Sequence, residues 1–117
     1  MLTLSVTNPL ESTIMSSQIE KSAVRGTMFI QSRTQVSAEL AGEAAILQTE
    51  SGVYYNLSEV GARIWQLLIH PCGVREISAQ IAAEYEVEPA ACEWDVVNLL
   101  TELHNNGLVQ IGDETHA

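Results

Sequence analysis

The sequence has 117 residues, 46% of them hydrophobic, which is enough to build the core of one modest domain. It carries 15 acidic and 5 basic side chains, for a formal net charge of −10, and after residue 34 only Arg63 and Arg75 are basic. A nucleic-acid-binding protein needs cations against phosphates, so this charge disfavours DNA or RNA as a partner and favours neutral or basic partners. No apolar run is long enough to suggest a membrane span, so no membrane partner is expected.

The first 26 residues are rich in Ser and Thr and show no sustained hydrophobic period. They predict a flexible extension that can include one short induced element, followed by a folded domain over residues 27–117. The extension has no basic n-region, so it does not read as a secretory signal, and Met15 is an alternative start. Cys72 and Cys92 lie 20 residues apart with no C-x-x-C pair, which favours reduced thiols in a cytoplasm over a disulfide framework.

Residues 27–56 lack a helical period and predict strands. The stretches TQVSAEL, AAILQT and VYYN are separated by two glycine-containing turns, AGE and ESG. Short runs divided by such turns are typical of a three-stranded antiparallel meander. Because side chains alternate across a strand, Tyr54 and Tyr55 cannot both face the core.

After these strands the hydrophobic period becomes helical and predicts three helices. The first has Ser58 as its N-cap and ends at HPCG, where Pro71 disfavours helical geometry in the residue before it. The second follows Gly73, which offers no side-chain acceptor for capping, and ends at EVEP. The third begins at Pro89 and ends before Gly107, which suits a left-handed cap. The three apolar faces are Val60, Ile64, Leu67 and Leu68; Val74, Ile77, Ile81 and Tyr85; and Cys92, Val96, Leu99, Leu100 and Leu103.

The predicted order favours an α+β domain with a three-stranded antiparallel sheet followed by three helices that cover one face of the sheet. LVQI, after the third helix, can add a short terminal strand. Trp65 adjoins Ile64 and is expected in the core. Trp94 is offset so far around its helix from Val96 that it is expected to leave the core. It can then belong to a partner surface or pack against the N-terminal extension.

The sequence contains no catalytic constellation. The motifs of serine hydrolases, phosphate-binding loops, dinucleotide folds and zinc peptidases are missing. Cys92 and His104 share a predicted helix but lie roughly 18 Å apart along its axis, too far for a thiol–imidazole pair. His70 and Cys72 are simply neighbours at a helix end, and no His or Cys shows metal-ligand spacing. We therefore expect no enzyme activity, no metal and no cofactor.

A series of motifs runs through the last two thirds of the chain. They are a Y-x-L/N element, G-x-x-I-W-x-L, an E-I-x-x-x-L-type helix with an E-Y-x-V ending, and D-V-x-x-x-L-x-x-L-x-x-x-G-L-V. Together they resemble the PqqD-like family over about residues 34–111. The chain departs from that family in two places. It has HPCG where the family commonly has a Gly-containing turn and a Thr cap, and it carries the N-terminal extension. The matching residues are Tyr55, Asn56, Leu57, Gly61, Ile64, Trp65, Leu68, Glu76, Ile77, Ile81, Glu84, Tyr85, Val87, Asp95, Val96, Leu100, Leu103, Gly107, Leu108 and Val109.

The resemblance implies a winged helix-turn-helix-like domain that does not bind DNA. Such domains are recognition elements for ribosomally made, post-translationally modified peptides: they hold the leader of a precursor and present its core to a modifying enzyme. Stand-alone members serve PQQ, lasso-peptide and sactipeptide-type pathways, and in lasso systems a separate cysteine peptidase removes the leader. We expect the lasso role, with a precursor leader peptide and a leader peptidase or other modifying enzyme as partners, and a monomer when free.

An exposed edge of the meander can accept a peptide as an added strand. The expected docking edge is VYYN, held in place by the turn and helix of NLSEVGARIW. Side-chain pockets between this strand and the third helix would give specificity, and two acids of the helix would meet Lys or Arg residues of the leader. The predicted peptide-binding residues are Val53, Tyr54 and Tyr55 on the strand and Asp95, Asn98, Leu99 and Glu102 on the helix.

Three other functions stay open at the level of the sequence. The same module can carry a leader to a radical-SAM or kinase-like tailoring enzyme, as in a PQQ-like pathway, and the neighbouring genes would distinguish the pathways. A winged-helix transcriptional regulator is disfavoured by the acidic charge. A small hydrolase that uses Cys72 or Cys92 ranks last, because neither thiol has an activating partner in the sequence pattern.

Overall fold

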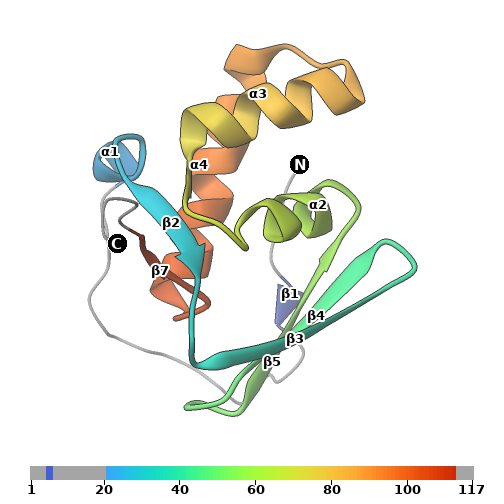
Figure 1. The fold of residues 1–117 in the computed structure, drawn as a ribbon, viewed down its shortest axis with the longest axis vertical. Helices are drawn as coiled ribbons and strands as arrows, with labels where there is room; N and C mark the ends of the chain where they lie inside the picture. Colours follow the sequence, from blue (N-terminus) through green and yellow to red (C-terminus); the bar gives the residue numbers. More distant parts are fainter. Residues whose placement is uncertain (1–4, 7–20, 113–117) are drawn as a thin grey trace.

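The computed structural model describes residues 5–6 and 21–112, which form a mixed α+β fold (Figure 1). The predicted division into an extension, residues 1–26, and a domain, residues 27–117, stays a prediction, because residues 1–4, 7–20 and 113–117 lie outside the described residues. In chain order the elements are β1 (Ser5–Val6), α1 (Lys21–Val24), β2 (Met28–Gln31), β3 (Gln35–Leu40), β4 (Glu43–Gln48), β5 (Val53–Ser58), α2 (Val60–Leu67), β6 (Cys72–Gly73), α3 (Val74–Tyr85), α4 (Pro89–Asn105) and β7 (Val109–Ile111).

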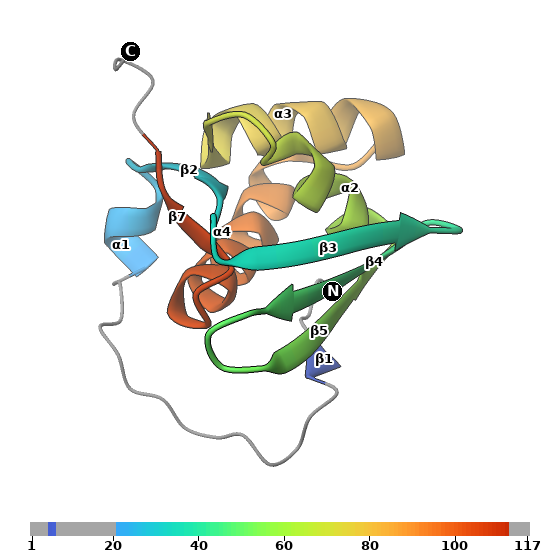
Figure 2. The same cartoon turned by 60° about the horizontal axis from the view of Figure 1, so that its bottom comes forward.

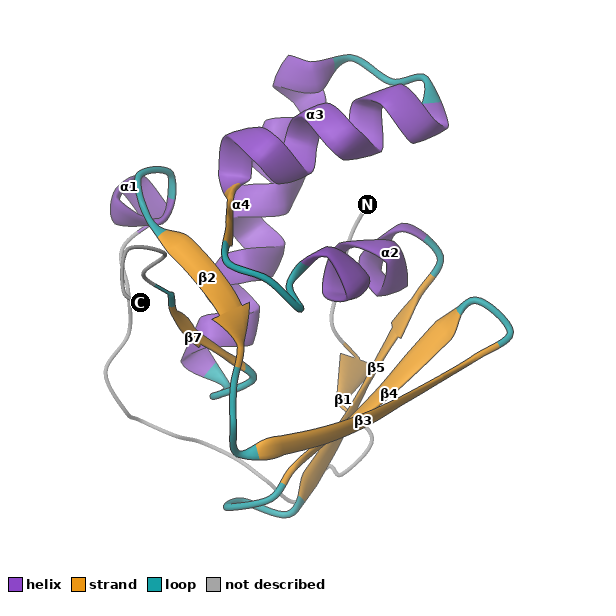
Figure 3. Ribbon diagram, viewed as in Figure 1, coloured by secondary structure: helices purple, strands orange, loops and turns teal. Residues whose placement is uncertain are grey.

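The predicted meander is confirmed as β3, β4 and β5. It is part of a larger antiparallel sheet with the order β1–β5–β4–β3, and the helices lie to one side of it (Figure 3). Ala41 and Gly42 turn the chain between β3 and β4 with φ values of 54° and 81°, the left-handed pair that closes a tight hairpin. Gly52, with φ 74°, turns the chain before β5. The fourth strand, β1, comes from the N-terminal segment and has no counterpart among the predicted strands.

A second sheet, with the order β6–β2–β7, corrects the prediction of a single three-stranded sheet. Phe29 of β2 lies opposite Cys72 of β6 on one side and Ile111 of β7 on the other. These strands have two to four residues and come from distant parts of the chain, so no local period indicates their pairing. The possible terminal strand at LVQI is β7 and belongs to this second sheet.

The three predicted helices are confirmed as α2, α3 and α4, with one wrong cap. Ser58 is the last residue of β5, because its pairing with β4 continues to that point, and Glu59 precedes α2 without a side-chain cap. At α3 the Glu76 carboxylate accepts a hydrogen bond from the Gly73 amide at 3.1 Å, which completes half of a capping box. Gly107 ends α4 with φ 75°, as predicted. Among the described residues, no helix is long and apolar enough to cross a membrane.

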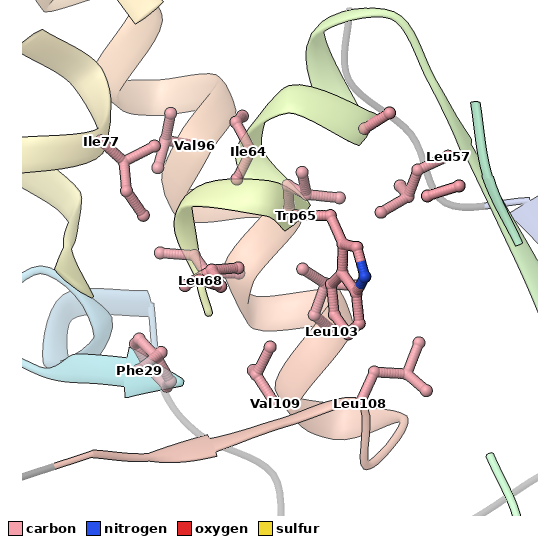
Figure 4. Packing of buried hydrophobic residues seen from close by; sticks show 14 of the residues in the cluster. Phe29, Leu57, Ile64, Trp65, Leu68, Ile77, Val96, Leu103, Leu108 and Val109 are labelled. Atoms are coloured by element: carbon pink, nitrogen blue, oxygen red, sulfur yellow. The ribbon is translucent and has the colours of Figure 1, made fainter. Parts of the chain in front are cut away.

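The core lies where α2 and α4 meet both sheets, and Figure 4 shows side chains from all of them around Trp65. Trp65 is completely buried, and its indole N–H donates to Ser37 Oγ at 3.2 Å. Leu57 packs closely over Gly61, where a Cβ would lie 3.3 Å from the leucine side chain. The predicted apolar faces are buried or partly buried except at Tyr85, which is 42% exposed because the last turn of α3 extends beyond the core.

Candidate functional site

The strand β5 alternates between buried and exposed side chains. Val53, Tyr55 and Leu57 are at most 5% exposed, whereas Tyr54 is 52% exposed. The Tyr55 hydroxyl donates to Asn106 Oδ1 at 3.3 Å and so ties β5 to the C-terminal end of α4. The expectation that the two tyrosines face opposite sides is confirmed, and Tyr55 is the structural one of the pair.

The outer face of the sheet around Tyr54 is mostly apolar. The register places Tyr54 opposite Leu47 of β4, and Leu47 opposite Val36 of β3, which is 61% exposed. The next cross-strand row consists of Ala38, Ala45 and the polar Asn56. A peptide strand beside β5 would point every second side chain toward this outer face, next to Tyr54.

The helix α4 turns one face to the core and the other outward. Leu99 is completely buried, Asp95 and Asn98 are partly exposed, and Glu102 is exposed. At about 100° per residue, Asp95, Asn98 and Glu102 fall within one arc of the helix. Trp94 is 53% exposed, so its predicted departure from the core is confirmed.

Asn98 carries an unusual acceptor on this side of α4. Its Oδ1 atom is buried, yet it has no hydrogen-bond donor within the part of the chain that the structure describes. A buried acceptor left without a donor destabilises a protein by about 1–3 kcal/mol. The helical period places Asn98 on the same side of α4 as Asp95 and Glu102, but it does not show that the Oδ1 atom lacks a donor among the described residues.

The structure therefore divides the seven predicted site residues into three groups. Val53, Tyr55 and Leu99 belong to the core, and Tyr54 lies on the outer face of the sheet. The remaining three, Asp95, Asn98 and Glu102, share the outward arc of α4. Their role in peptide binding stays a prediction.

An open pocket of about 370 Å³, which no pattern in the sequence predicts, lies at the C-terminal end of α4. Gln48 in its wall donates to Thr34 Oγ1 at 2.9 Å and to the Gly107 carbonyl oxygen at 2.7 Å. The ring of His104 stacks edge-on against Phe29, with 5.9 Å between centroids. These contacts join α4 to both sheets and give the pocket wall a structural role.

Neither cysteine has the surroundings of an activated nucleophile. Burial raises the pKa of the Cys72 thiol, and the Glu76 carboxylate raises it further. Burial also raises the pKa of Cys92, with Asp95 and Glu93 adding to the effect. Both thiols therefore stay protonated near neutral pH. Within residues 5–6 and 21–112, no three His, Cys, Asp or Glu side chains are grouped as a metal site would require.

Known proteins resemble this chain over its sheet and helices. The family described as Coenzyme PQQ synthesis protein D (PqqD) matches residues 43–109. TbiB1, solved in complex with the TbiA(β) leader peptide, is 36% identical with a TM-score of 0.66, over 69% of this chain and 94% of that one. A lasso peptide synthetase B1 complexed with the leader peptide is 28% identical with a TM-score of 0.62, over 70% of this chain and 96% of that one. The curated proteins contain no significant match.

The family match spans more than half of the chain and includes β4, β5 and the three helices α2, α3 and α4. It also covers all the motif residues named above, from Tyr55 of β5 to Val109 of β7. The chain belongs to the PqqD family.

Proposed function

We propose that this protein binds the leader segment of a ribosomally made precursor peptide in lasso-peptide biosynthesis. It would catalyse no reaction itself and would present the precursor to a leader peptidase or another modifying enzyme. The observation that carries the proposal is the likeness to two B1 proteins, each solved with a leader peptide and each covered almost completely by this chain. The protonated thiols support a non-catalytic role, and two free cysteines fit a reducing cytoplasm.

We infer a winged helix-turn-helix-like arrangement in which α3 and α4 form the helical pair and β3, β4 and β5 form the wing. The leader adds to the edge of β5 as an antiparallel strand. Main-chain hydrogen bonds then hold the leader without reading its sequence, whereas side chains on the two faces of the added strand provide the selection.

The predicted site residues take different roles in this complex. On the outer face of the sheet, Tyr54 packs beside the leader side chains that point to that face. On the inner face, Asn98 accepts a hydrogen bond from the leader, and Asp95 and Glu102 meet its basic residues. Val53, Tyr55 and Leu99 form the rigid wall behind them. Exposed ion pairs contribute only ~0–1 kcal/mol each, so apolar contacts should dominate the affinity.

The proposal is tested by fluorescence anisotropy with labelled leader peptides from precursor genes that lie beside this one. We expect saturable binding with a Kd near micromolar or tighter, which corresponds to about −8 kcal/mol. A peptide of scrambled sequence serves as the control for non-specific binding. If a folded protein binds none of the neighbouring leaders, the proposed function is wrong and only the family assignment remains.

The role of Tyr54 is tested by the variant Tyr54→Ala, with Tyr85→Ala as a matched control that removes a similarly exposed tyrosine from α3. Cross-strand aromatic pairs contribute up to about 1 kcal/mol, so Tyr54→Ala should weaken leader binding roughly two- to fivefold. Tyr85→Ala should leave the affinity unchanged. Equal affinities for the two variants would remove Tyr54 from the site.

A further inference from the structure

The edge of β5 that faces away from β4 is not free, because the chain's own N-terminal segment pairs with it. The strand β1 pairs antiparallel with β5, with Ser5 opposite Asn56 and Val6 opposite Tyr55. β5 is therefore an interior strand of the sheet, with β4 on one side and β1 on the other. Figures 1 and 2 show β1 beside β5. A strand has two edges, so no second peptide can pair with Tyr55 and Asn56 while β1 is in place.

We propose that β1 is an intramolecular competitor of the leader peptide, so that a leader binds to β5 by displacing residues 5–6. This inference rests on the proposed function, because it takes the edge of β5 as the place where the leader adds. It gives the N-terminal extension a role in regulating that site.

The lengths of the two pairings allow displacement. β1 pairs with β5 at two positions, whereas β4 pairs with β5 along all six residues of the strand. A leader that extends along more of β5 than β1 does gains additional main-chain hydrogen bonds and additional contacts with Tyr54. A peptide that can pair at only one or two positions gains nothing over β1. The competition therefore selects for leaders that match the full length of the edge.

The attachment of the extension keeps β1 close to this edge. Val24 of α1 is completely buried, and α1 packs on α4. Just after α1, Arg25 Nη1 pairs with Glu93 Oε1 of α4 at 2.8 Å, and the Thr27 hydroxyl donates to the Ala23 carbonyl at 2.7 Å. Residues 7–20 thus connect a point fixed on α4 to β5, the two elements proposed to hold the leader. A tethered segment has a local concentration that dilution does not lower, so even a short strand can compete.

The first test removes β1 by substitution in the full chain. Ser5→Pro combined with Val6→Pro eliminates both backbone donors of β1, and Ser16→Pro combined with Ser17→Pro is the matched control outside β1. An occupant present for more than two thirds of the time raises the apparent Kd about threefold or more. The β1 variant should therefore bind the leader at least about threefold more tightly than wild type, and the control variant should match wild type.

The other outcomes of this test separate the two proposals. Equal affinities for the three proteins would overturn the competition and leave leader binding intact. Weaker binding by the β1 variant would also overturn it, because β1 would then contribute to the leader's site. Loss of binding in all three folded proteins, wild type included, would overturn the proposed function and the competition with it.

The second test locks β1 in place. The variant combines Ser5→Cys with Asn56→Cys, because Ser5 and Asn56 lie opposite each other. Cross-strand partners have Cα atoms about 4.5–5.5 Å apart, a distance that a disulfide can span. Cys72→Ala and Cys92→Ala in the same chain prevent other pairings. The oxidised protein should bind the leader at least about tenfold more weakly than the reduced protein. Failure of the disulfide to form, or equal affinity in the two redox states, would overturn the proposal.

Discussion

Tyr54 and Tyr55 are neighbours of the same residue type, yet they lie on opposite faces of the sheet and have different surroundings. Tyr55 lies opposite Ile46 on the inner face, where its ring joins the core and its hydroxyl reaches Asn106. Tyr54 lies opposite Leu47 on the outer face. Alternation along a strand predicts that the two diverge. Which tyrosine turns inward depends on the register with β4, and that is defined only when the sheet is assembled.

An ion pair between Arg63 and Glu84 connects α2 to α3. Arg63 Nε donates to Glu84 Oε1 and Arg63 Nη2 to Glu84 Oε2, each at 2.9 Å. The hydrogen bond from Arg63, supported by one from Gln80, lowers the pKa of Glu84 to about 2. Glu84 in turn raises the pKa of Arg63. Glu84 is also one of the residues that carry the family resemblance.

This ion pair predicts a pH dependence of stability. The pKa of Glu84 in the folded protein lies below its ordinary value of 4.5, so the pair stabilises the fold above pH 4.5. That contribution is lost as the pH falls from 4.5 toward about 2. Glu84→Gln should lower the urea midpoint at pH 7, and the difference from wild type should shrink toward pH 2.5. Trp65, which is buried, provides the fluorescence signal.

The control for this prediction is Glu86→Gln, which removes an exposed acid one residue beyond α3. It should leave the midpoint close to that of wild type throughout the pH range. A difference between wild type and Glu84→Gln that is as large at pH 2.5 as at pH 7 would contradict the role assigned to this ion pair.

Elements with a strong local period were predictable, and those held by distant partners were not. β3, β4, β5 and the three long helices follow periods of 2 or 3.6 residues. The family match covers all of these elements except β3. β2 is recognisable only through its pairing of Phe29 with Cys72 and Ile111, more than 40 residues away along the chain. β1 has two residues, too few for any period.

The candidate site was predictable to a similar extent. The helix period places Asp95, Asn98 and Glu102 on one arc, and the strand period separates Tyr54 from Tyr55. Neither period shows that Asn98 Oδ1 lacks a donor among the described residues, or that a segment some 50 residues earlier pairs with β5. Both features depend on contacts between elements, which a local pattern does not contain.

A prediction about stability concerns the contact between Gly107, at the end of α4, and Gln48 of β4. Gly107 has φ 75°, and a Cβ there would lie 3.0 Å from Gln48 Nε2, the atom that donates to the Gly107 carbonyl. Gly42 has φ 81°, with no atom within 4 Å of such a Cβ. The left-handed conformation costs an alanine about 1–2 kcal/mol at either position. Gly107→Ala should therefore destabilise the protein more than Gly42→Ala in urea unfolding, and equal losses would contradict the contact.

At the scale of the whole molecule, the net charge of −10 sets the field that an approaching peptide meets. This field attracts any basic peptide and raises the association rate at low salt. The acids on the outward arc of α4 add a local contribution that depends on the position of the peptide. Charge reversals at two places in the molecule separate the general field from the local contribution.

Asp95→Lys and Glu86→Lys change the net charge equally, but only Asp95 lies on the outward arc of α4. Asp95→Lys should slow leader association and weaken binding more than Glu86→Lys does, with a larger difference at low salt than at high salt. Stopped-flow fluorescence with a labelled leader measures the association and dissociation rates of each variant. Equal effects of the two substitutions would show that the general field acts alone and would remove Asp95 from the site.

The most direct test of leader addition to β5 is an NMR measurement of intermolecular NOEs between the isotope-labelled protein and an unlabelled leader peptide. Strand addition predicts cross-strand NOEs from leader backbone protons to residues 53–58 of β5, together with contacts to Asn98 and Glu102 of α4. NOEs confined to α3, or to β3 at the edge of the sheet opposite β1, would contradict the account.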